Sequence, residues 1–375
     1  MIDRRSFLRT GAGAALASSV GLPLAARASE RVALTAEVAD IRLLPPSYPR
    51  TSIWGYDGSA PGPTIRLPQG SRFSRRFANQ LPQPSSVHWH GIRIDNAMDG
   101  VSGLTQEAVA PGDSFDYDFV APDAGTFWYH SHTRSFEQVA RGLHGALIVD
   151  EPEPIDIDRE EVLILDDWLL DPETGQILGG FGAPHDLSHA GRMGNFTTTN
   201  ATYNLALDVR QNERLRLRLI NAATARIFQL QLAGLDGWIL SKDGMPLATP
   251  ERVAGRFLLA PAQRLDLIVD VTADVGGTAH LVQIDRDNAF SQIAFEVRGQ
   301  AAKASRRPPA PLPPNARAAP DLANARRLSL HMEGGAMGGM RSAMMNGSAR
   351  SMRDLMQAGQ FWAFNGAIGG IDVPP

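Results

Sequence analysis

Short runs of alternating apolar and polar residues, separated by proline and glycine turns, dominate the sequence after residue 31. Clear examples are residues 71–77, 114–120 and 213–220. Because side chains along a strand point to opposite faces in turn, this alternation predicts strands with one buried face. The turns, among them Pro61-Gly62-Pro63, have spacings typical of a β-sandwich. The predicted fold class is all-β, and 375 residues are enough for more than one core.

The alternation divides the chain into two similar units, predicted at residues 31–153 and 159–298. Residues 299–327 are rich in Pro and Ala and predict a stiff, extended linker at which the second unit ends. Residues 328–375 begin with methionines interleaved with Gly and Ser, and residues 360–366 predict a strand entering a turn. We expect this last stretch to be the beginning of an incomplete third domain.

The first 28 residues have the composition of a targeting segment rather than of part of the fold. Arg4 and Arg5 precede a weakly apolar stretch, residues 11–26, that ends at small residues around Ala28. This order predicts a twin-arginine export signal over residues 1–28, and therefore a periplasmic mature protein. The alternative is an ordinary helix start with two accidental arginines. The stretch is too short and too weakly apolar for a membrane helix of about 20 residues, so no membrane association is expected.

Charge and cysteine content exclude several classes of function. The formal net charge is −4, which offers no overall attraction to the nucleic-acid backbone, so nucleic acid is not an expected partner. The sequence contains no cysteine. Disulfides, thiolate nucleophiles, iron–sulfur clusters and copper sites built on a thiolate are therefore excluded for these residues.

Two His-x-His pairs are the chemical centre of the sequence: His88-Trp89-His90 and His130-Ser131-His132. In a strand, residues i and i+2 point to one face, so each pair can present two imidazoles to one site. Imidazole suits copper, zinc, iron or nickel. One isolated pair could equally be structural, but two pairs in one predicted domain indicate a metal site. The aromatic residues 127–129 are expected to give the second pair a dry, rigid surround.

Of the five remaining histidines, His331 directly precedes the methionines considered below, and the other four are expected to be structural or exposed. One lies at a glycine-rich strand entry, two lie in a glycine-rich loop, and one lies alone in a strand. These residues are His144, His185, His189 and His280.

The order and spacing of residues 88–92, 99–106, 111–112 and 124–132 resemble the N-terminal copper half of a laccase-like multicopper oxidase. Residues 61–65, 142–149 and 217–223, with Asp243-Gly244 and Pro261, extend the resemblance over nearly the whole mature chain. It implies tandem cupredoxin-like Greek-key β-sandwich domains. It also implies substrate oxidation at a mononuclear blue copper, coupled to reduction of dioxygen to water at a trinuclear copper cluster.

The resemblance also implies residue roles. By position, His88 would ligate the type 2 copper, and the type 3 pair would be ligated by His90, His130 and His132. Asp99 matches a carboxylate behind the ligands that assists proton delivery. The alternative for Asp99 is a turn residue before the following glycine.

The sequence departs from the family in its C-terminal motifs. The His-rich and His-Cys-His segments are absent from these 375 residues, so the type 1 copper site is absent and the trinuclear cluster is not completed in the usual way. We expect the open face of such a half-site to leave apolar surface near Trp89 and Phe127 exposed to water.

The methionines after residue 331 allow two interpretations. Thioethers suit Cu(I), so the Gly-spaced residues are candidate copper contacts. Alternatively, residues 348–360 form a short helix with Met352, Leu355 and Met356 on its apolar face. For Met352 and Met356 this helical interpretation is favoured. The candidate copper contacts are Met337, Met340, Met344 and Met345.

Three functions follow from these patterns. The first is an exported multicopper oxidase that oxidises a phenol, an aromatic amine or a metal ion with dioxygen. The alternative is a non-catalytic periplasmic copper-binding or copper-tolerance protein. The third is a copper-free scaffold on the same fold, against which the four histidines argue.

Overall fold

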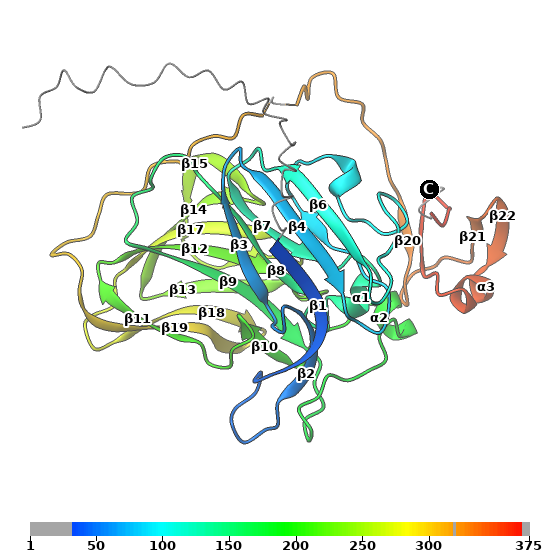
Figure 1. Cartoon of the computed structure of the whole chain (residues 1–375), viewed down its shortest axis with the longest axis horizontal. Helices are drawn as coiled ribbons and strands as arrows, with labels where there is room; N and C mark the ends of the chain where they lie inside the picture. Colours follow the sequence, from blue (N-terminus) through cyan, green and yellow to red (C-terminus); the bar gives the residue numbers. More distant parts are fainter. Residues whose placement is uncertain (1–31, 318–319, 370–375) are drawn as a thin grey trace, which may run out of the picture. The chain divides into compact units, whose positions relative to one another are not determined.

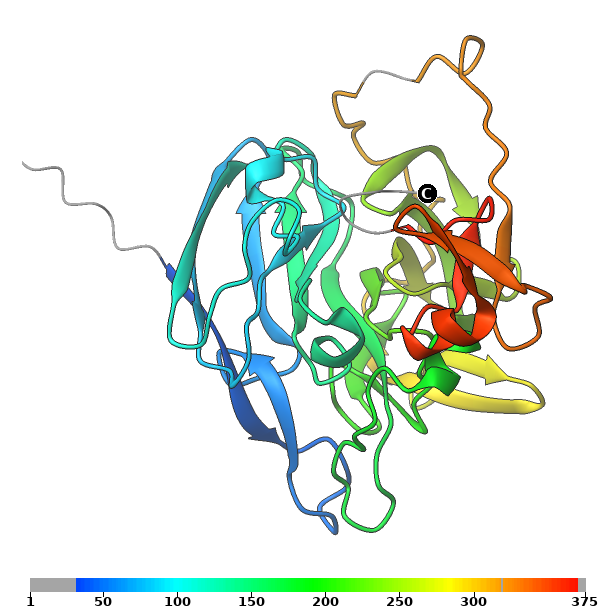
Figure 2. The ribbon, with the colours of Figure 1, turned by 90° about the vertical axis from the view of Figure 1, so that its right-hand side faces the viewer.

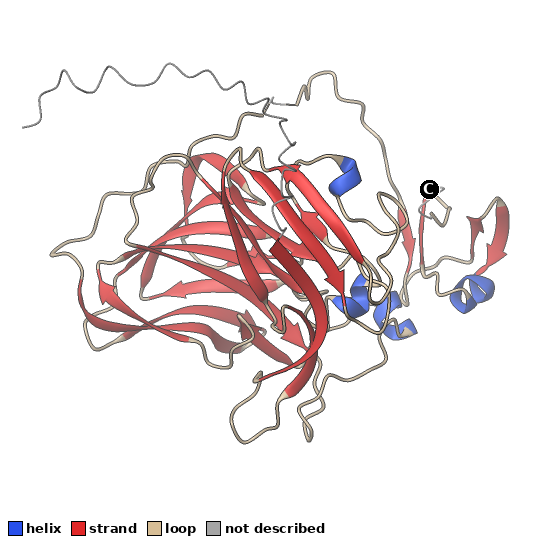
Figure 3. Cartoon of the chain, in the orientation of Figure 1, coloured by secondary structure: helices blue, strands red, loops and turns tan. Residues whose placement is uncertain are grey.

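The computed structural model describes residues 32–317 and 320–369. The predicted export signal, residues 1–28, lies outside the described residues. Strands predominate in the two sandwiches described below and the helices are short (Figure 3), so the predicted all-β class is confirmed. In residues 32–317 and 320–369, no helix has the length and apolar character needed to cross a bilayer.

The first two sheets form a sandwich in the blue to cyan part of the chain (Figure 1). One sheet has the order β2-β1-β4-β6 and the other β3-β8-β7-β5. The first sheet comprises β1 (Val32–Ile41), β2 (Thr51–Tyr56), β4 (Arg72–Asn79) and β6 (Ser114–Val120). The second comprises β3 (Gly62–Pro68), β5 (His88–His90), β7 (Gly125–His130) and β8 (His144–Asp150). Alternate residues of both sheets enclose one core, to which β5 and β7 contribute Trp89, Phe127 and Tyr129.

The second two sheets form another sandwich from the green to yellow part of the chain. Its six-stranded sheet has the order β10-β9-β12-β17-β14-β15, and its five-stranded sheet β11-β19-β18-β13-β16. The six strands are β9 (Arg159–Trp168), β10 (Phe196–Thr199), β12 (Arg214–Asn221), β14 (Leu235–Lys242), β15 (Met245–Arg252) and β17 (Arg264–Val271). The five are β11 (Ala206–Gln211), β13 (Phe228–Ala233), β16 (Phe257–Leu259), β18 (Thr278–Asp285) and β19 (Asn288–Gln300).

The same pairing pattern recurs in the two sandwiches. β1 pairs antiparallel with β2 and parallel with β4, and β4 pairs antiparallel with β6. Correspondingly, β9 pairs antiparallel with β10 and parallel with β12, and β12 pairs antiparallel with β17. The recurrence supports the repeat inferred from sequence, while the domain boundaries at 31–153 and 159–298 stay a prediction.

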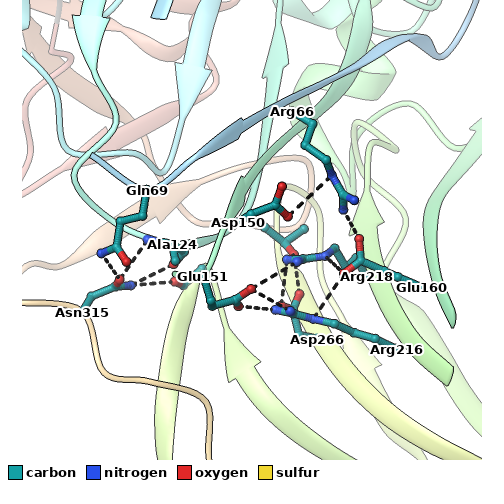
Figure 4. Close-up of polar contacts among 12 residues, drawn as sticks. Arg66, Gln69, Ala124, Asp150, Glu151, Glu160, Arg216, Arg218, Asp266 and Asn315 are labelled. Atoms are coloured by element: carbon teal, nitrogen blue, oxygen red, sulfur yellow. Dashed lines mark hydrogen bonds and ion pairs between the residues drawn. The ribbon is translucent and has the colours of Figure 1, made fainter. Parts of the chain in front are cut away.

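Buried charges join the two sandwiches (Figure 4). Asp266 of β17 accepts hydrogen bonds from Arg216 at 2.6 Å and from the Thr126 hydroxyl of β7 at 2.5 Å. Arg218 reaches the same Thr126 hydroxyl at 2.9 Å, and Glu151 receives two bonds from Arg216. Burial disfavours the charged form of Asp266, but the two arginines lower its pKa. Breaking one of these buried ion pairs would cost about 3–5 kcal/mol, so the network is a fixed feature of the second sandwich. β7 is tied to it through the two hydrogen bonds of the Thr126 hydroxyl.

Part of the predicted linker is docked on the protein. Leu312 is buried against Trp238 and Ile268. The Asn315 side chain accepts from the Ala124 N–H and donates to the Ala124 carbonyl, both at 2.9 Å (Figure 4). Residues 312–315 are therefore not a free spacer, because the Leu312 side chain is buried and the Asn315 amide is hydrogen-bonded. Ala124 directly precedes β7, so this contact also holds the strand that carries His130.

The described C-terminal residues form short elements: β20 (Met332–Gly334), β21 (Ser342–Met345), β22 (Ser348–Ser351), α3 (Met352–Gln357) and β23 (Trp362–Phe364), with α3 beside the β21–β22 hairpin (Figure 2). The helix predicted over 348–360 is wrong at its start. Residues 348–351 pair with β21 across an Asn346-Gly347 turn in which both residues have positive φ. Ser351 then caps α3 by accepting the Asp354 N–H.

Candidate metal centre

β5 and β7 bring the histidines together by antiparallel pairing. His88 lies opposite His130, and His90 lies opposite Trp128. The ring centroids of His90, His130 and His132 lie 5.4, 5.3 and 5.3 Å from that of His88. One ligand nitrogen from each of His88, His90 and His130 lies within 4.8 Å of the others. All four predicted histidines therefore meet at one place, three of them at metal-ligand spacing.

Backbone carbonyls fix the tautomers of two of these rings. The His88 Nδ1–H donates to the Asp99 carbonyl at 2.7 Å, and the His130 Nδ1–H donates to the Ser131 carbonyl at 2.9 Å. A carbonyl only accepts, so the Nε2 atom of each ring keeps its lone pair. His90 Nδ1 lies 3.2 Å from His130 Nε2. This arrangement presents nitrogen lone pairs to a common point, as metal-binding histidines require.

The site also keeps its imidazoles neutral. Burial lowers the pKa of His88 and lowers that of His130 well below its usual range. Burial, followed by the positive charge of Arg264, lowers the pKa of His90 to about 3. A neutral imidazole can ligate a metal and an imidazolium cannot, so protons compete weakly for these nitrogens.

Asp99 lies behind His88. Its carboxylate Oδ2 is 3.5 Å from His88 Nδ1, and its backbone carbonyl accepts the bond from that nitrogen. The Asp99 side chain keeps 29% of its surface exposed. It therefore touches both the ring and solvent, as a group that exchanges protons with the site would have to.

The aromatic residues divide between the two faces of β7. The Trp128 ring lies 4.2 Å from His130 and 5.2 Å from His90, so it provides part of the expected dry surround. Trp89 and Phe127 point the other way and are fully buried in the first core. Trp89 and Phe127 themselves are not exposed, because strand alternation that directs the histidines outward directs these rings inward. The apolar surface exposed beside the histidines includes Phe136, which is 41% exposed and lines the pocket described below.

Arg264 is a residue beside this site that sequence reasoning missed, as it missed Asp186 and Arg192 of the pocket lining. It comes from β17 of the second sandwich, and its side chain is 4% exposed. Its guanidinium donates to the carbonyls of Thr126, Ala262 and Asp243. It also packs against Gly91, since a Cβ on that glycine would lie 2.1 Å from Arg264 Nη2. Gly91 has a positive φ of +87°, a conformation that favours glycine. The sequence carries no signal of which side chain packs against it.

A pocket of about 410 Å³ opens at the four histidines. The charged residues on its lining are Asp186 and Arg192, from the loop that contains α2 (Pro184–Ser188). Arg192 Nη1 lies 3.8 Å from Asp186 Oδ2. Phe136 and Pro261 contribute apolar wall from the two sandwiches. The pocket has room for a metal centre together with a small ligand.

The other four histidines considered from the sequence lie outside this cluster, as does His331. His144 is buried and its Nε2 lies 2.9 Å from Asp166 Oδ2. His185 and His189 stack on each other at 4.2 Å and do not line the pocket. His280 Nδ1 lies 2.9 Å from the Ser291 hydroxyl. Their structural or exposed placement agrees with expectation.

The methionines are divided by burial. Met340 is 7% exposed and packs with Leu355, and Met345 lies against the same small core. Met337 and Met344 are exposed by 96% and 45%. Two methionines were expected on the apolar face of the helix. Met352 packs on this core, as expected, but Met356 is 50% exposed, so the prediction that Met356 lies on the apolar face is wrong. Copper contact by any of these side chains stays a prediction.

Comparison with known proteins agrees with the fold and the histidine cluster. Residues 37–154 match the family model described as multicopper oxidase. The crystal structure of Lac15 from a marine microbial metagenome is 42% identical, with a TM-score of 0.69 over 78% of this chain and 73% of Lac15. A multi-copper oxidase from Pseudomonas thermotolerans is 36% identical, with a TM-score of 0.74 over 81% of this chain and 71% of that one.

The multicopper oxidase MmcO of Mycobacterium tuberculosis is 32% identical over 73% of this chain and 62% of its own length. The chain spans about half the length of the curated relatives it matches. Fold and site define a tandem cupredoxin-like protein, as predicted. By these similarities, the chain belongs to the multicopper oxidase family.

Proposed function

We propose that this chain is a copper-binding oxidoreductase that serves the oxidation of a small-molecule or metal-ion reductant by dioxygen. It carries the N-terminal half of the trinuclear copper site. One observation carries the proposal: three imidazole nitrogens lie within 4.8 Å of one another, in a pocket shared by both sandwiches. Relatives named as oxidases favour this function over the non-catalytic copper-binding alternative.

The residues fit copper by the chemistry of their donors. Imidazole is a ligand that suits copper, and the carbonyl bonds to Nδ1 of His88 and His130 leave Nε2 as the donor atom. His88 would hold the type 2 ion, and His90, His130 and His132 the type 3 pair. Copper, when bound, supplies the one-electron redox chemistry that couples the reductant to dioxygen.

The protein's own groups have three tasks in this proposal. Asp99 moves protons between solvent and the His88 side of the pocket. Trp128 and the apolar wall limit access of water. Arg264 holds the ends of both histidine strands from the second sandwich, through Thr126 and Gly91. Among the methionines, the exposed Met337 and Met344 are better placed to meet Cu(I) in solution than Met340 and Met345.

Copper loading tests this function directly. The metal-free chain is incubated with a mixture of copper and zinc, dialysed, and its metal content measured by mass spectrometry. We expect copper to be retained in stoichiometric amounts and in preference to zinc, following the order of intrinsic affinities. A chain that retains no copper would contradict the proposal.

Replacing Gly91 by Ala should weaken copper binding by about 10- to 100-fold, as loss of a group that supports a ligand does. The added Cβ would displace the Arg264 guanidinium, which lies 2.1 Å from its position. Gly70→Ala is the matched control, because Gly70 also has positive φ, +77°, but nothing lies within 4 Å of its Cβ position. Competition titration with a copper chelator measures both. Equal affinities would show that Arg264 has no part in holding the site.

We further propose a periplasmic location reached by the twin-arginine route. Arg4→Lys with Arg5→Lys should then trap the precursor inside the cell, because that route reads the arginine pair. Cell fractionation followed by immunoblotting measures the distribution. Undiminished periplasmic protein in the double variant would rule the route out.

A further inference from the structure

A second pocket, of about 460 Å³, lies in the second sandwich and shares no lining residue with the histidine pocket. Its volume is in the range of about 300–1,000 Å³ that small-molecule sites occupy. One wall is β10 with the turn that follows it, and the other is the hairpin that joins β18 to β19. The proposed copper chemistry makes no use of this pocket.

Buried amides form one side of this pocket. The Gln292 amide nitrogen donates to the Thr197 hydroxyl at 3.1 Å and to the Gln283 side-chain oxygen at 2.7 Å. Gln283 is 3% exposed and Gln292 is 5% exposed. Among the described residues, no protein acceptor bonds the amide nitrogen of Gln283, although that side chain lines the pocket. A buried amide with unused donors is a built recognition group for a ligand oxygen.

Aromatic rings lie beside these amides. Phe196 and Tyr203 stack with centroids 5.8 Å apart and planes inclined by 20°. Tyr203 is 45% exposed and Phe290, across the pocket on the hairpin, is 48% exposed. Exposed rings next to hydrogen-bonding groups suit a ligand that has both an apolar face and a polar edge.

The charges argue against other classes of ligand. Arg226 and Asp285 are the charged residues on the lining. Arg226 donates to Asp167 at 2.9 Å, and its Nη1 lies 3.7 Å from Asp285 Oδ2. Two carboxylates thus balance the one cation, which leaves no free positive charge for an anion. A single lining carboxylate without histidine is a poor donor set for a metal ion.

We propose that this pocket binds a neutral carbohydrate of one or two pyranose rings. Sugar hydroxyls both donate and accept, which matches the side chains of Gln283, Gln292 and Thr197. The C–H face of a pyranose is apolar and matches the rings of Tyr203 and Phe290. The ligand is either a soluble sugar or the end of a surface polysaccharide, since both present the same ring.

Calorimetric titration of the full 375-residue chain with cellobiose, maltose and lactose tests the proposal. We expect at least one disaccharide to bind saturably, and Tyr203→Ala and Phe290→Ala each to weaken it about tenfold, as loss of one stacking contact does. Both side chains are half exposed, so the variants should remain folded. Tyr48→Ala is the matched control, because Tyr48 is 37% exposed and does not line the pocket.

Sedimentation with insoluble cellulose and starch distinguishes the two sources. Co-sedimentation that the disaccharide competes away indicates a polysaccharide, and disaccharide binding without sedimentation indicates a soluble sugar. The proposal is overturned if no disaccharide binds and neither polymer sediments the chain. It is also overturned if Tyr203→Ala binds as tightly as the unmodified protein, or if Tyr48→Ala weakens binding equally.

Discussion

Replacing His90 and His132 together by Ala should abolish most copper binding. His90 Nδ1 lies 3.2 Å from His130 Nε2, and the His132 ring lies 5.3 Å from that of His88, so the double change removes half of the four converging imidazoles. Two isolated ligands hold a metal ion far less well than a fixed set of three or four. The copper content of the dialysed protein measures the loss.

The matched control for this change is His185→Ala with His189→Ala. These two rings stack at 4.2 Å, and the His185 side chain is 76% exposed, so they also form a pair of histidines close in space. They do not line the pocket, and we expect their loss to leave copper content unchanged. Equal losses from the two double variants would reject the assignment of the copper ligands to His88, His90, His130 and His132.

The 375-residue chain loaded with copper should be colourless or weakly coloured and should consume little oxygen with phenols. The intense colour and rapid electron entry of a blue copper site depend on a cysteine thiolate, and this sequence contains no cysteine. Methionine thioethers and imidazoles do not replace that ligand. An absorption spectrum and an oxygen electrode, with a cysteine-containing multicopper oxidase measured in parallel, provide the comparison.

This prediction concerns the 375 residues without a partner chain. Supplying a polypeptide with the His-Cys-His segment should restore both the blue absorption and the turnover if the missing ligands are the sole cause. Steady oxidation of phenols by the purified chain alone, with copper present, would show that these residues assemble a complete redox site.

Period-two alternation located the strands well because it reflects a local geometric constraint. The run predicted at 114–120 coincides with β6, Ser114–Val120. Turn chemistry acts over a similarly short range. Where two local signals competed, the interpretation was wrong: an apolar helical pattern from 348 onward concealed the Asn346-Gly347 hairpin turn, which commits the next four residues to β22.

The candidate site could be predicted to a similar extent. The i, i+2 spacing places His88 and His90 on one face of their strand, so the chemistry of the donors was legible in the sequence. The distance of His88 and His90 from His130 could not be predicted from the sequence, because it depends on the antiparallel register of β5 and β7. The burial that lowers the pKa of these histidines depends on the pocket around them.

The sequence by itself determined the all-β class, the histidines that are candidates for copper and the absence of a thiolate, since these depend on residue identity and on spacing within a strand. Only the tertiary structure decided that Arg264 would lie against Gly91, that Asn315 would bind the residue before β7, and that Met340 would be core while Met337 is exposed. Each of these contacts joins residues tens to hundreds of positions apart or depends on which side chains fill a given volume. Their free energy comes from close packing and hydrogen bonds between specific neighbours, and no local pattern in the sequence records which neighbours those are.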